Sequence, residues 1–303
     1  MLQAYNPQNK DIQVFIKDRL YHRSEAKVSV FDSSVQGGDA VWEGLRIYNG
    51  KAFAFTDHVS RMQASAKTLA FTDIPSFEFI KEAIKKTLEA NGMYHNVHIR
   101  LTLTRGEKIT SGMDPRLNTM GSCLIVLAEF KAPVFDNEKG TTLITAHTRR
   151  NNPAFLDSKI HHNNLLNNIL AKIEANYAGA GEALMLDING FVSETNSCNI
   201  FMIKDDALYT PHADACLPGI TRKKVLALAA NLQIPTVIRN ISLSEMYNAD
   251  IVFTTGTMGE LTPVTMIDGR SITNNASTNI FTRISEAYKM LTLTEGETII
   301  EQV

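Results

Sequence analysis

Two Asn-Gly pairs constrain the fold of this chain most strongly. Asn49-Gly50 separates the strand-like residues 45–48 and 51–55, and Asn189-Gly190 lies between two strand-like runs in the second half. Asparagine and glycine both tolerate the left-handed backbone that a tight hairpin turn requires. Each pair therefore predicts an antiparallel hairpin, one in each half of the chain.

Helices are predicted between and after these hairpins. A capping side chain at Thr56 or Asp57 begins a helix through Leu69. Further helices are expected at residues 77–90, 165–173 and 279–291, and another is expected to open within residues 217–222 and to run through about residue 231. In the helix from residue 165, apolar residues recur at helical spacing and predict one packed face: Leu165, Leu166, Ile169, Leu170 and Ile173. Additional strands are expected at residues 12–16, 27–30, 98–104, 122–128 and 249–253, so the fold class is α/β.

Length and hydrophobic content allow one large domain or two ordinary ones. The 303 residues are 44% hydrophobic and 20% charged, which is enough for a sizeable core. Residues 130–140 hold Pro133 and a polar cluster, and we predict an interdomain linker there. The linker divides the chain into a smaller N-terminal α/β domain, residues 1–129, and a larger C-terminal cofactor-binding domain, residues 141–303.

Charge and cysteine content argue against several classes of protein. The 30 basic and 32 acidic residues nearly cancel, which argues against nucleic-acid binding. Cys123, Cys198 and Cys216 are scattered without metal-ligand spacing, so we expect no metal site and a reduced, cytoplasmic protein. No apolar run has the form of a signal peptide or the length of a membrane span, so no membrane partner is expected.

Residues 98–104 alternate apolar and polar side chains. The apolar residues share one face, and the opposite face carries a row of polar residues: His98, Arg100, Thr102 and Thr104. A solvated sheet face and a row of hydrogen-bond donors lining a cleft both explain this pattern. The sequence leaves the two interpretations open.

Several polar motifs follow one another in the second half of the chain. Lys159 stands among serine, histidine and asparagine residues, and Glu194 lies inside a strand, where carboxylates are uncommon. Residues 217–222 open a helix with free backbone N–H groups, and the hydroxyl- and glycine-rich residues 254–259 are typical of an anion-binding turn. Each motif alone has an ordinary explanation, such as a solvated lysine, a carboxylate on an open face or a normally capped helix.

Pyridoxal 5′-phosphate requires the combination of these motifs. A lysine binds its aldehyde, and a carboxylate keeps its pyridine nitrogen protonated so that the ring can take up electrons. Backbone N–H groups, hydroxyls and an arginine hold its phosphate. The ordered set, preceded by Arg61 on an early helix, therefore predicts this cofactor.

With these motifs and the stretch Gly-Asp-Ala-Val-Trp-Glu-Gly-Leu-Arg at residues 38–46, the chain resembles the class IV aminotransferases, the fold-type-IV pyridoxal phosphate enzymes. That family includes branched-chain amino acid aminotransferases, D-amino acid aminotransferases and aminodeoxychorismate lyases. The resemblance covers nearly the whole chain and is nearest to the branched-chain enzymes, which share an aromatic residue followed by Glu-Gly-x-Arg. It implies a two-domain, D-amino acid aminotransferase-like fold with the cofactor at the domain interface.

The resemblance also implies roles for individual residues. Lys159 is the expected Schiff-base lysine and proton carrier, Glu194 the partner of the pyridine nitrogen, and Asn199 the family's strand asparagine. The residues implied in phosphate and ring binding are Arg61, Leu217, Gly219, Ile220, Thr221, Gly256 and Thr257. Those implied in substrate binding are Trp42, His98, Arg100, Thr257 and Met258, with Arg100 matching an arginine that helps to bind the acidic side chain of glutamate.

Several positions depart from the branched-chain pattern. Asn164 replaces a tyrosine whose hydroxyl reaches the cofactor's ring oxygen, so we expect the Asn164 amide to make that contact. His98 replaces a second tyrosine, a loop tyrosine of the family falls near Gly37, and Met258 replaces a smaller residue. These departures indicate a changed substrate pocket beside an intact cofactor site.

The resemblance implies a homodimeric aminotransferase. We expect it to move an amino group between an amino acid, branched-chain or otherwise apolar, and a 2-oxo acid such as 2-oxoglutarate. A D-amino acid aminotransferase and an aminodeoxychorismate lyase-like enzyme of the same fold stay open as alternatives. A binding protein that has lost the chemistry is disfavoured, because Lys159 and Glu194 are both present.

Overall fold

The computed structural model describes residues 4–133, 137–272 and 279–301 and divides into two compact units. The N-terminal unit comprises Gln3–Ala132, Ile160–Asn164 and Thr292–Val303, and the C-terminal unit comprises Pro133–Lys159 and Leu165–Leu291. The final residues belong to the N-terminal unit because β16 (Glu297–Thr298) pairs with β4 (Lys51–Ala52) there. The linker at 130–140 stays a prediction, and its residues 134–136 lie outside the described residues.

Within the described residues, the N-terminal unit contains a seven-stranded sheet, whose strand order is β16-β4-β3-β5-β6-β1-β2. Its further elements are η1 (Pro7–Asn9), β1 (Gln13–Ile16), β2 (Arg19–His22), α1 (Ser33–Gly37), β3 (Ala40–Tyr48), α2 (Phe55–Thr68), α3 (Phe77–Ala90), β5 (Val97–Thr104), η2 (Pro115–Leu117) and β6 (Cys123–Phe130). The first predicted hairpin is confirmed, because β3 pairs antiparallel with β4 and both Asn49 and Gly50 have positive φ.

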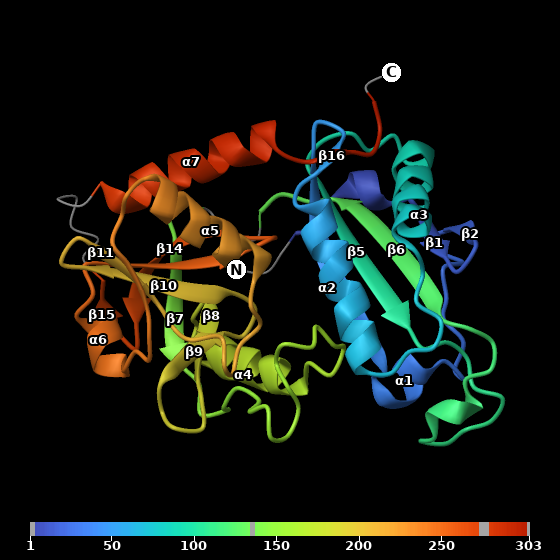
Figure 1. The fold of residues 1–303 in the computed structure, drawn as a ribbon, viewed down its shortest axis with the longest axis horizontal. Coiled ribbons are helices and arrows are strands. Elements are labelled where there is room, and N and C mark those ends of the chain that lie inside the picture. The colour runs from blue at the N-terminus through green and yellow to red at the C-terminus, as the bar shows by residue number, and fades with distance from the viewer. Residues whose placement is uncertain (1–3, 134–136, 273–278, 302–303) are drawn as a thin grey trace. The chain divides into compact units, whose positions relative to one another are not determined.

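Helices α2 and α3 cover one face of this sheet (Figure 1). The odd-numbered residues of β3 and β5, such as Leu45 and Ile99, pair in register and pack with the helices in one core. The opposite face carries the polar row, in which Thr104 is fully buried and His98 is 9% exposed. This burial excludes the interpretation of the row as an open, solvated face.

A nine-stranded sheet forms the described part of the C-terminal unit, with the path β12-β11-β10-β13-β14-β7-β8-β9 and β15 paired to β14. The elements are β7 (Thr141–Thr145), α4 (Leu166–Tyr177), β8 (Glu182–Leu186), β9 (Val192–Thr195), β10 (Asn199–Lys204), β11 (Ala207–Thr210), α5 (Ile220–Asn231), β12 (Thr236–Ile238), α6 (Leu243–Tyr247), β13 (Ile251–Gly256), β14 (Glu260–Ile267), β15 (Arg270–Ser271) and α7 (Ile280–Thr294). The second predicted hairpin is confirmed by the antiparallel pairing of β8 with β9.

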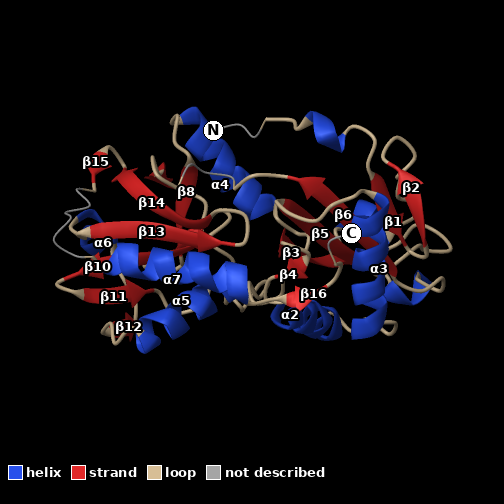
Figure 2. Ribbon diagram, turned by 90° about the horizontal axis from the view of Figure 1, so that it is seen from above, coloured by secondary structure: helices blue, strands red, loops and turns tan. Residues whose placement is uncertain are grey.

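Helices cover both faces of this sheet. α4 packs on Ala183 and Met185 of β8, whereas Met246 of α6 packs with Leu184 and Leu186 on the opposite face of that strand (Figure 1). Figure 2 shows α7 running along β13. Phe201 and Phe253 stack at 5.2 Å between ring centroids, and Phe253 contacts Phe281 of α7 at 5.1 Å. These rings join β10, β13 and α7 into one core layer.

The packing predicted for the helix after residue 165 is wrong. α4 contacts β7 and β8 through small residues, and Ala171 and Ala175 are the buried positions on it. Its large apolar side chains are exposed by 42–72%, and they are Leu166, Ile169, Leu170 and Ile173. Alanine allows the helix to approach the sheet closely, so the bulky stripe points to the outside.

Two local predictions in the first domain are also wrong. Residues 27–30 form no strand, and Val30 is 72% exposed there, whereas β2 forms earlier in the chain. Helix α2 begins at Phe55, with Ala54 as its N-cap and no capping side chain, so Asp57 lies in the first turn and does not cap it.

Candidate active site

Glu194 lies in β9, and its carboxylate is held on both oxygens. Arg150 Nε donates to Oε1 at 2.5 Å, and Asn199 Nδ2 donates to Oε2 at 3.0 Å. Glu194 and Arg150 are 5% and 6% exposed. A buried carboxylate is costly unless it is paired, so Arg150 supplies the counter-charge that allows Glu194 to occupy a strand interior.

Asn199 joins this carboxylate to the start of α5. Its Nδ2 also donates to the Leu217 carbonyl at 2.9 Å, and its Oδ1 accepts from the Gly219 N–H at 3.1 Å. A Cβ atom at Gly219 would lie 2.0 Å from Asn199 Oδ1, so only glycine permits this approach. One side chain therefore fixes the distance between Glu194 and the helix start.

The start of α5 is suited to an anion. Gly219 is the N-cap and provides no capping side chain, and Ile220 and Thr221 begin the helix. The first turn contains Arg222 and no acidic residue. An uncapped helix start combines available N–H groups with the positive end of the helix dipole, an arrangement that binds phosphate in many proteins.

A turn at residues 257–259 joins β13 to β14, with Gly256 paired to Glu260. Thr257 and Met258 are partly exposed in this turn. Next to it, Thr255 is paired in register with Asn199, and its buried Oγ1 has no hydrogen-bond partner among the described residues. Buried hydroxyls are rarely left without a partner, so this strand end is suited to an oxygen or nitrogen atom of a ligand.

Lys159 lies in a turn, and its side chain is 46% exposed. Its backbone N–H donates to Asp157 Oδ1 at 2.9 Å, and its Nζ lies 4.0 Å from the same oxygen. Burial and the charge of Glu194 raise the pKa of the Cys216 thiol, while the charges of Arg222, Arg150 and Lys159 lower it. The charges of Lys159 and Glu194 therefore both act on the Cys216 thiol.

The donor set of the C-terminal unit fits pyridoxal 5′-phosphate. A buried carboxylate is available for a ring nitrogen, an uncapped helix start for a phosphate, and an accessible lysine for an aldehyde. The orphaned Thr255 hydroxyl adds a buried polar atom beside them.

In the N-terminal unit, Arg61 binds Glu43. Arg61 Nε and Nη2 donate to the two Glu43 oxygens, each at 2.7 Å, and His58 Nδ1 lies 2.6 Å from Oε2. His161 Nδ1 lies 3.1 Å from Oε1. The Glu43 side chain is fully buried, so the orientation of Arg61 depends on this carboxylate.

The charges of this cluster follow from its surroundings. Burial would raise the pKa of Glu43, but His161 and Arg61 hold that pKa well below its usual range. Burial lowers the pKa of His161 to about 4, although Glu43 opposes the shift. Because Arg61 is a permanent cation beside the carboxylate, we assign the ion pair to Glu43 and Arg61 and leave His161 neutral at neutral pH.

Trp42, His98 and Arg100 lie on the sheet face opposite to Glu43. The Arg100 guanidinium carbon lies 3.4 Å from the centroid of the Trp42 ring. Burial, together with the charges of Lys131, Arg46 and Arg100, lowers the pKa of His98 to about 3, so this side chain is neutral. Arg100 is thus the cationic member of the predicted substrate residues in this unit and lies above the indole, while Arg46 on the same face is paired across the strands with His98.

Asn164 is exposed and bound to the backbone of α1's C-cap. Its Nδ2 donates to the Gly38 carbonyl at 3.0 Å, and its own N–H donates to His162 Nδ1 at 3.1 Å. The contact of Asn164 with a cofactor oxygen stays a prediction, and in this structure the amide holds the chain at Gly38.

Sequence reasoning missed three residues that contribute to these clusters: Glu43, which binds Arg61, and the residues Arg150 and His161. Arg150 follows another arginine in the chain, and nothing local distinguishes the buried one from its neighbour. Glu43 offered a weak signal, because it alternates with apolar residues on the buried face of a strand. His161 gave none, since its partner is 118 residues away.

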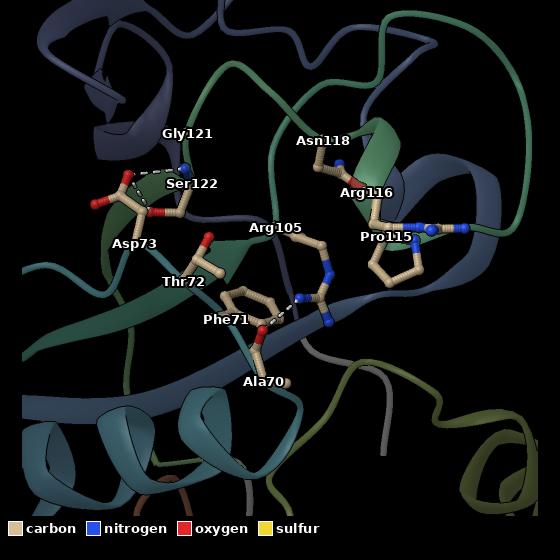
Figure 3. Close-up of a pocket in the computed structure, with 10 residues that line it drawn as sticks. All are labelled: Ala70, Phe71, Thr72, Asp73, Arg105, Pro115, Arg116, Asn118, Gly121 and Ser122. Carbon is tan, nitrogen blue, oxygen red and sulfur yellow. Dashed lines mark hydrogen bonds between the residues drawn. The ribbon is translucent and has the colours of Figure 1, made fainter.

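A separate pocket of about 240 Å³ lies at the η2 end of the N-terminal unit and contains no predicted site residue (Figure 3). Arg105 crosses it, donates to the Leu69 and Ala70 carbonyls and pairs with Asp39 at 2.6 Å. The guanidinium also lies over the Phe71 ring. The charge of Arg105 is thus neutralised by Asp39 of the same unit.

Comparisons with known proteins identify the family of the chain. Residues 40–267 match the family model described as Amino-transferase class IV. The chain is 58% identical over 286 residues to branched-chain-amino-acid aminotransferase-like protein 2 of Arabidopsis thaliana, which covers 94% of this chain and 51% of that protein. It is 31% identical to D-alanine aminotransferase of Bacillus licheniformis, over 94% of this chain and 98% of that protein.

Solved structures have the same fold. The branched-chain aminotransferase of the thermophilic archaeon Thermoproteus uzoniensis, crystallised with norvaline, superposes with a TM-score of 0.86 at 30% identity, covering 93% of this chain and 95% of that one.

The chain spans about half the length of the Arabidopsis relatives that it matches. Among the described residues, no helix has the length and hydropathy needed to cross a membrane. The predicted α/β fold of two sheet-based parts is confirmed, and the chain belongs to the class IV aminotransferase family.

Proposed function

We propose that this chain is a pyridoxal phosphate-dependent aminotransferase that moves an amino group between an amino acid, branched-chain or otherwise apolar, and a 2-oxo acid such as 2-oxoglutarate. The observation that carries the proposal is the link through Asn199 between the buried Glu194 carboxylate and the uncapped start of α5. A ring nitrogen and a phosphate of one cofactor require these two groups at a fixed separation.

When bound, the cofactor supplies an electron sink that makes the Cα proton of an amino acid removable. Glu194 keeps the ring nitrogen protonated, and Arg150 and Asn199 fix the direction of its carboxylate. Ile220, Thr221 and the Thr257 turn would hold the phosphate, and Leu217 would bind the ring. Lys159 would hold the aldehyde group of the cofactor, and its Nζ would act as the general acid–base that moves the Cα proton.

The substrate-binding residues of the N-terminal unit are Trp42, His98 and Arg100. Arg100 binds the distal carboxylate of 2-oxoglutarate or glutamate, because a guanidinium grips a carboxylate with two parallel hydrogen bonds. His98 is neutral and adds no second charge. The N–H groups of the turn at Thr257 and Met258 bind the α-carboxylate.

The enzyme acts as a homodimer, and the exposed apolar stripe of α4 supports this part of the proposal. The stripe is about 18 Å long and carries large apolar side chains, and Tyr177 at its end is 90% exposed. The charged residues Lys172 and Glu174 of this helix bind other parts of the chain, because Lys172 donates to the Gly181 carbonyl and Glu174 accepts from Thr148. Such a stripe matches an isologous interface between two copies. The three cysteines are free thiols, which suits the reducing cytoplasm.

The test is to add single L- and D-amino acids to the cofactor-loaded protein and follow the conversion of its absorption band to that of pyridoxamine phosphate. Conversion by L-leucine or L-valine, reversed by 2-oxoglutarate, supports the proposal. Conversion by D-alanine alone would favour a D-amino acid aminotransferase, the activity named for the Bacillus licheniformis relative. Release of pyruvate from an aminodeoxychorismate-like substrate without any amino acceptor would favour a lyase.

A further inference from the structure

The indole of Trp42, the single tryptophan of the chain, is fixed by the segment that follows Lys159. The Trp42 backbone N–H donates to the His161 carbonyl at 2.9 Å, and Nε1 donates to the His162 carbonyl at 3.1 Å. The imidazole of His161 lies beside the indole, with 4.0 Å between ring centroids. Two hydrogen bonds and a ring contact hold the indole in one orientation.

His161 is held in turn by the buried carboxylate of Glu43. At neutral pH Glu43 is ionised and His161 is neutral, so the Nδ1 atom that lies 3.1 Å from Oε1 carries the proton and donates it. Glu43 is also bound by Arg61, and its side chain is fully buried. The position of the indole therefore depends on a network built around a fully buried carboxylate.

Arg100 rests on this fixed indole. Its guanidinium carbon lies 3.4 Å from the ring centroid, and its Nη2 donates to Asn163 Oδ1 at 3.3 Å. Gly44, which is paired with Arg100 across the two strands, presents no side chain on this face. Burial lowers the pKa of Arg100 to about 10, so it stays cationic, and within the described residues it forms no ion pair.

These contacts hold the cation weakly. A ring face and a long hydrogen bond to a neutral amide stabilise a guanidinium less than a two-pronged bond to a carboxylate does. A carboxylate within reach would thus draw Arg100 away from the indole. An uncharged side chain offers no such partner and would leave Arg100 in place.

We propose that Asn163 and Trp42 hold Arg100 in a parked position on the indole, and that a substrate with a second carboxylate releases it. The inference rests on the proposed function, because it explains how one site accepts both an apolar amino acid and a dicarboxylic 2-oxo acid. In the parked position a flat, weakly hydrated group borders the substrate. Asn163 and Trp42 are then specificity-determining residues, and His161 is a positioning residue that acts through Trp42.

The first test is Asn163→Asp in the cofactor-loaded enzyme. The new carboxylate turns a neutral hydrogen bond into a charge-assisted one of about twice the strength and should retain Arg100 in the parked position. Glutarate, a dicarboxylate that cannot react, is titrated while Trp42 fluorescence is recorded. We expect a saturable change in the wild type and an apparent Kd raised by roughly tenfold in the variant. The KM for 2-oxoglutarate should rise by the same factor more than the KM for L-leucine.

A control separates parking from simple repulsion between the introduced carboxylate and the substrate. The Arg100→Met variant has no cation to be held on the indole. Adding Asn163→Asp to this variant should therefore not change the ratio of the KM for 2-oxoglutarate to the KM for L-leucine. If the substitution raises the KM for 2-oxoglutarate equally in both backgrounds, repulsion explains the effect and the proposal is overturned.

His161→Phe provides a test in the opposite direction. The ring beside the indole is kept and the hydrogen bond to Glu43 is lost, so the indole is less well fixed and Arg100 is released more easily. The KM for 2-oxoglutarate should fall relative to that for L-leucine by about three- to tenfold. A rise, as in Asn163→Asp, contradicts the positioning role. If the protein shows the glutarate response but catalyses no amino transfer, the proposed function is wrong and the parked position of Arg100 is still supported.

Discussion

Glu194 occupies a strand interior, and its proposed role can be tested by an isosteric change. Glu194→Gln keeps the shape of the side chain and removes the charge that holds a ring nitrogen protonated. One charge-assisted hydrogen bond contributes about 1.5–3 kcal/mol, which corresponds to a loss in kcat of about ten- to a hundredfold. The cofactor should stay bound, as its absorption band will show.

Glu182 provides a matched control for this change. It is a buried carboxylate on the neighbouring strand β8, 3% exposed, and it accepts a hydrogen bond from Thr195 at 2.6 Å. Burial raises the pKa of Glu182, so an amide is a close substitute for it. Glu182→Gln should leave kcat within about twofold, and equal losses in the two variants would make the role of Glu194 structural.

His161 makes the stability of the fold depend on pH. Its pKa is about 4 in the folded protein and 6.5 ordinarily. Between these values the unfolded chain binds a proton that the folded chain does not, so the free energy of unfolding falls as the pH falls from 6.5 to 4. The slope is about 1.4 kcal/mol per pH unit for one fully titrating group.

Urea unfolding of wild type and His161→Phe at several pH values measures this contribution. The variant should have a shallower slope by about one proton in that window, whatever its absolute stability. His98, whose pKa is lowered to about 3, titrates in both proteins and cancels from the comparison. Identical slopes would show that His161 is charged in the folded state.

Among the elements, α4 carries the exposed apolar stripe to which we assign the proposed dimer interface. Four of its apolar side chains are more than 40% exposed. Ile169→Asp would place a charge in the centre of the stripe, and burying an unpaired carboxylate costs several kcal/mol. Light scattering should therefore report a dimer for the wild type and a monomer for this variant.

Leu293→Asp is the control for α4, since Leu293 is 54% exposed on α7. This variant should stay dimeric. A monomeric wild type, or a dimer that tolerates Ile169→Asp, would exclude the α4 stripe as the interface.

Elements with a strong local code were predictable from the sequence. Asn49-Gly50 determines its turn because both residues adopt positive φ. Ser242 and Glu245 form a capping box, and the spacing Ser-x-x-Glu is typical of that motif. The start of α5 at Ile220 follows from the glycine before it. Where packing decides the outcome, as for α4, periodicity identified the helix and assigned its buried face wrongly.

At the scale of the whole molecule, the limits of sequence reasoning lie in long-range pairs. Glu43 meets His161 across 118 residues, and Arg150 meets Glu194 across 44. No local pattern encodes these contacts, because they form only when separate elements fold together. The C-terminal residues show the same limit, since β16 returns to pair with β4 near the start of the chain.

The most direct test of the account is the covalent attachment of the cofactor. Cofactor-saturated protein should be yellow, and borohydride reduction followed by peptide mass analysis should find one pyridoxyl group, on Lys159. Lys172, which donates to the Gly181 carbonyl, and the other lysines should stay unlabelled. A label on another lysine, or none on saturated protein, would contradict the assignment of Lys159 and with it the proposed chemistry.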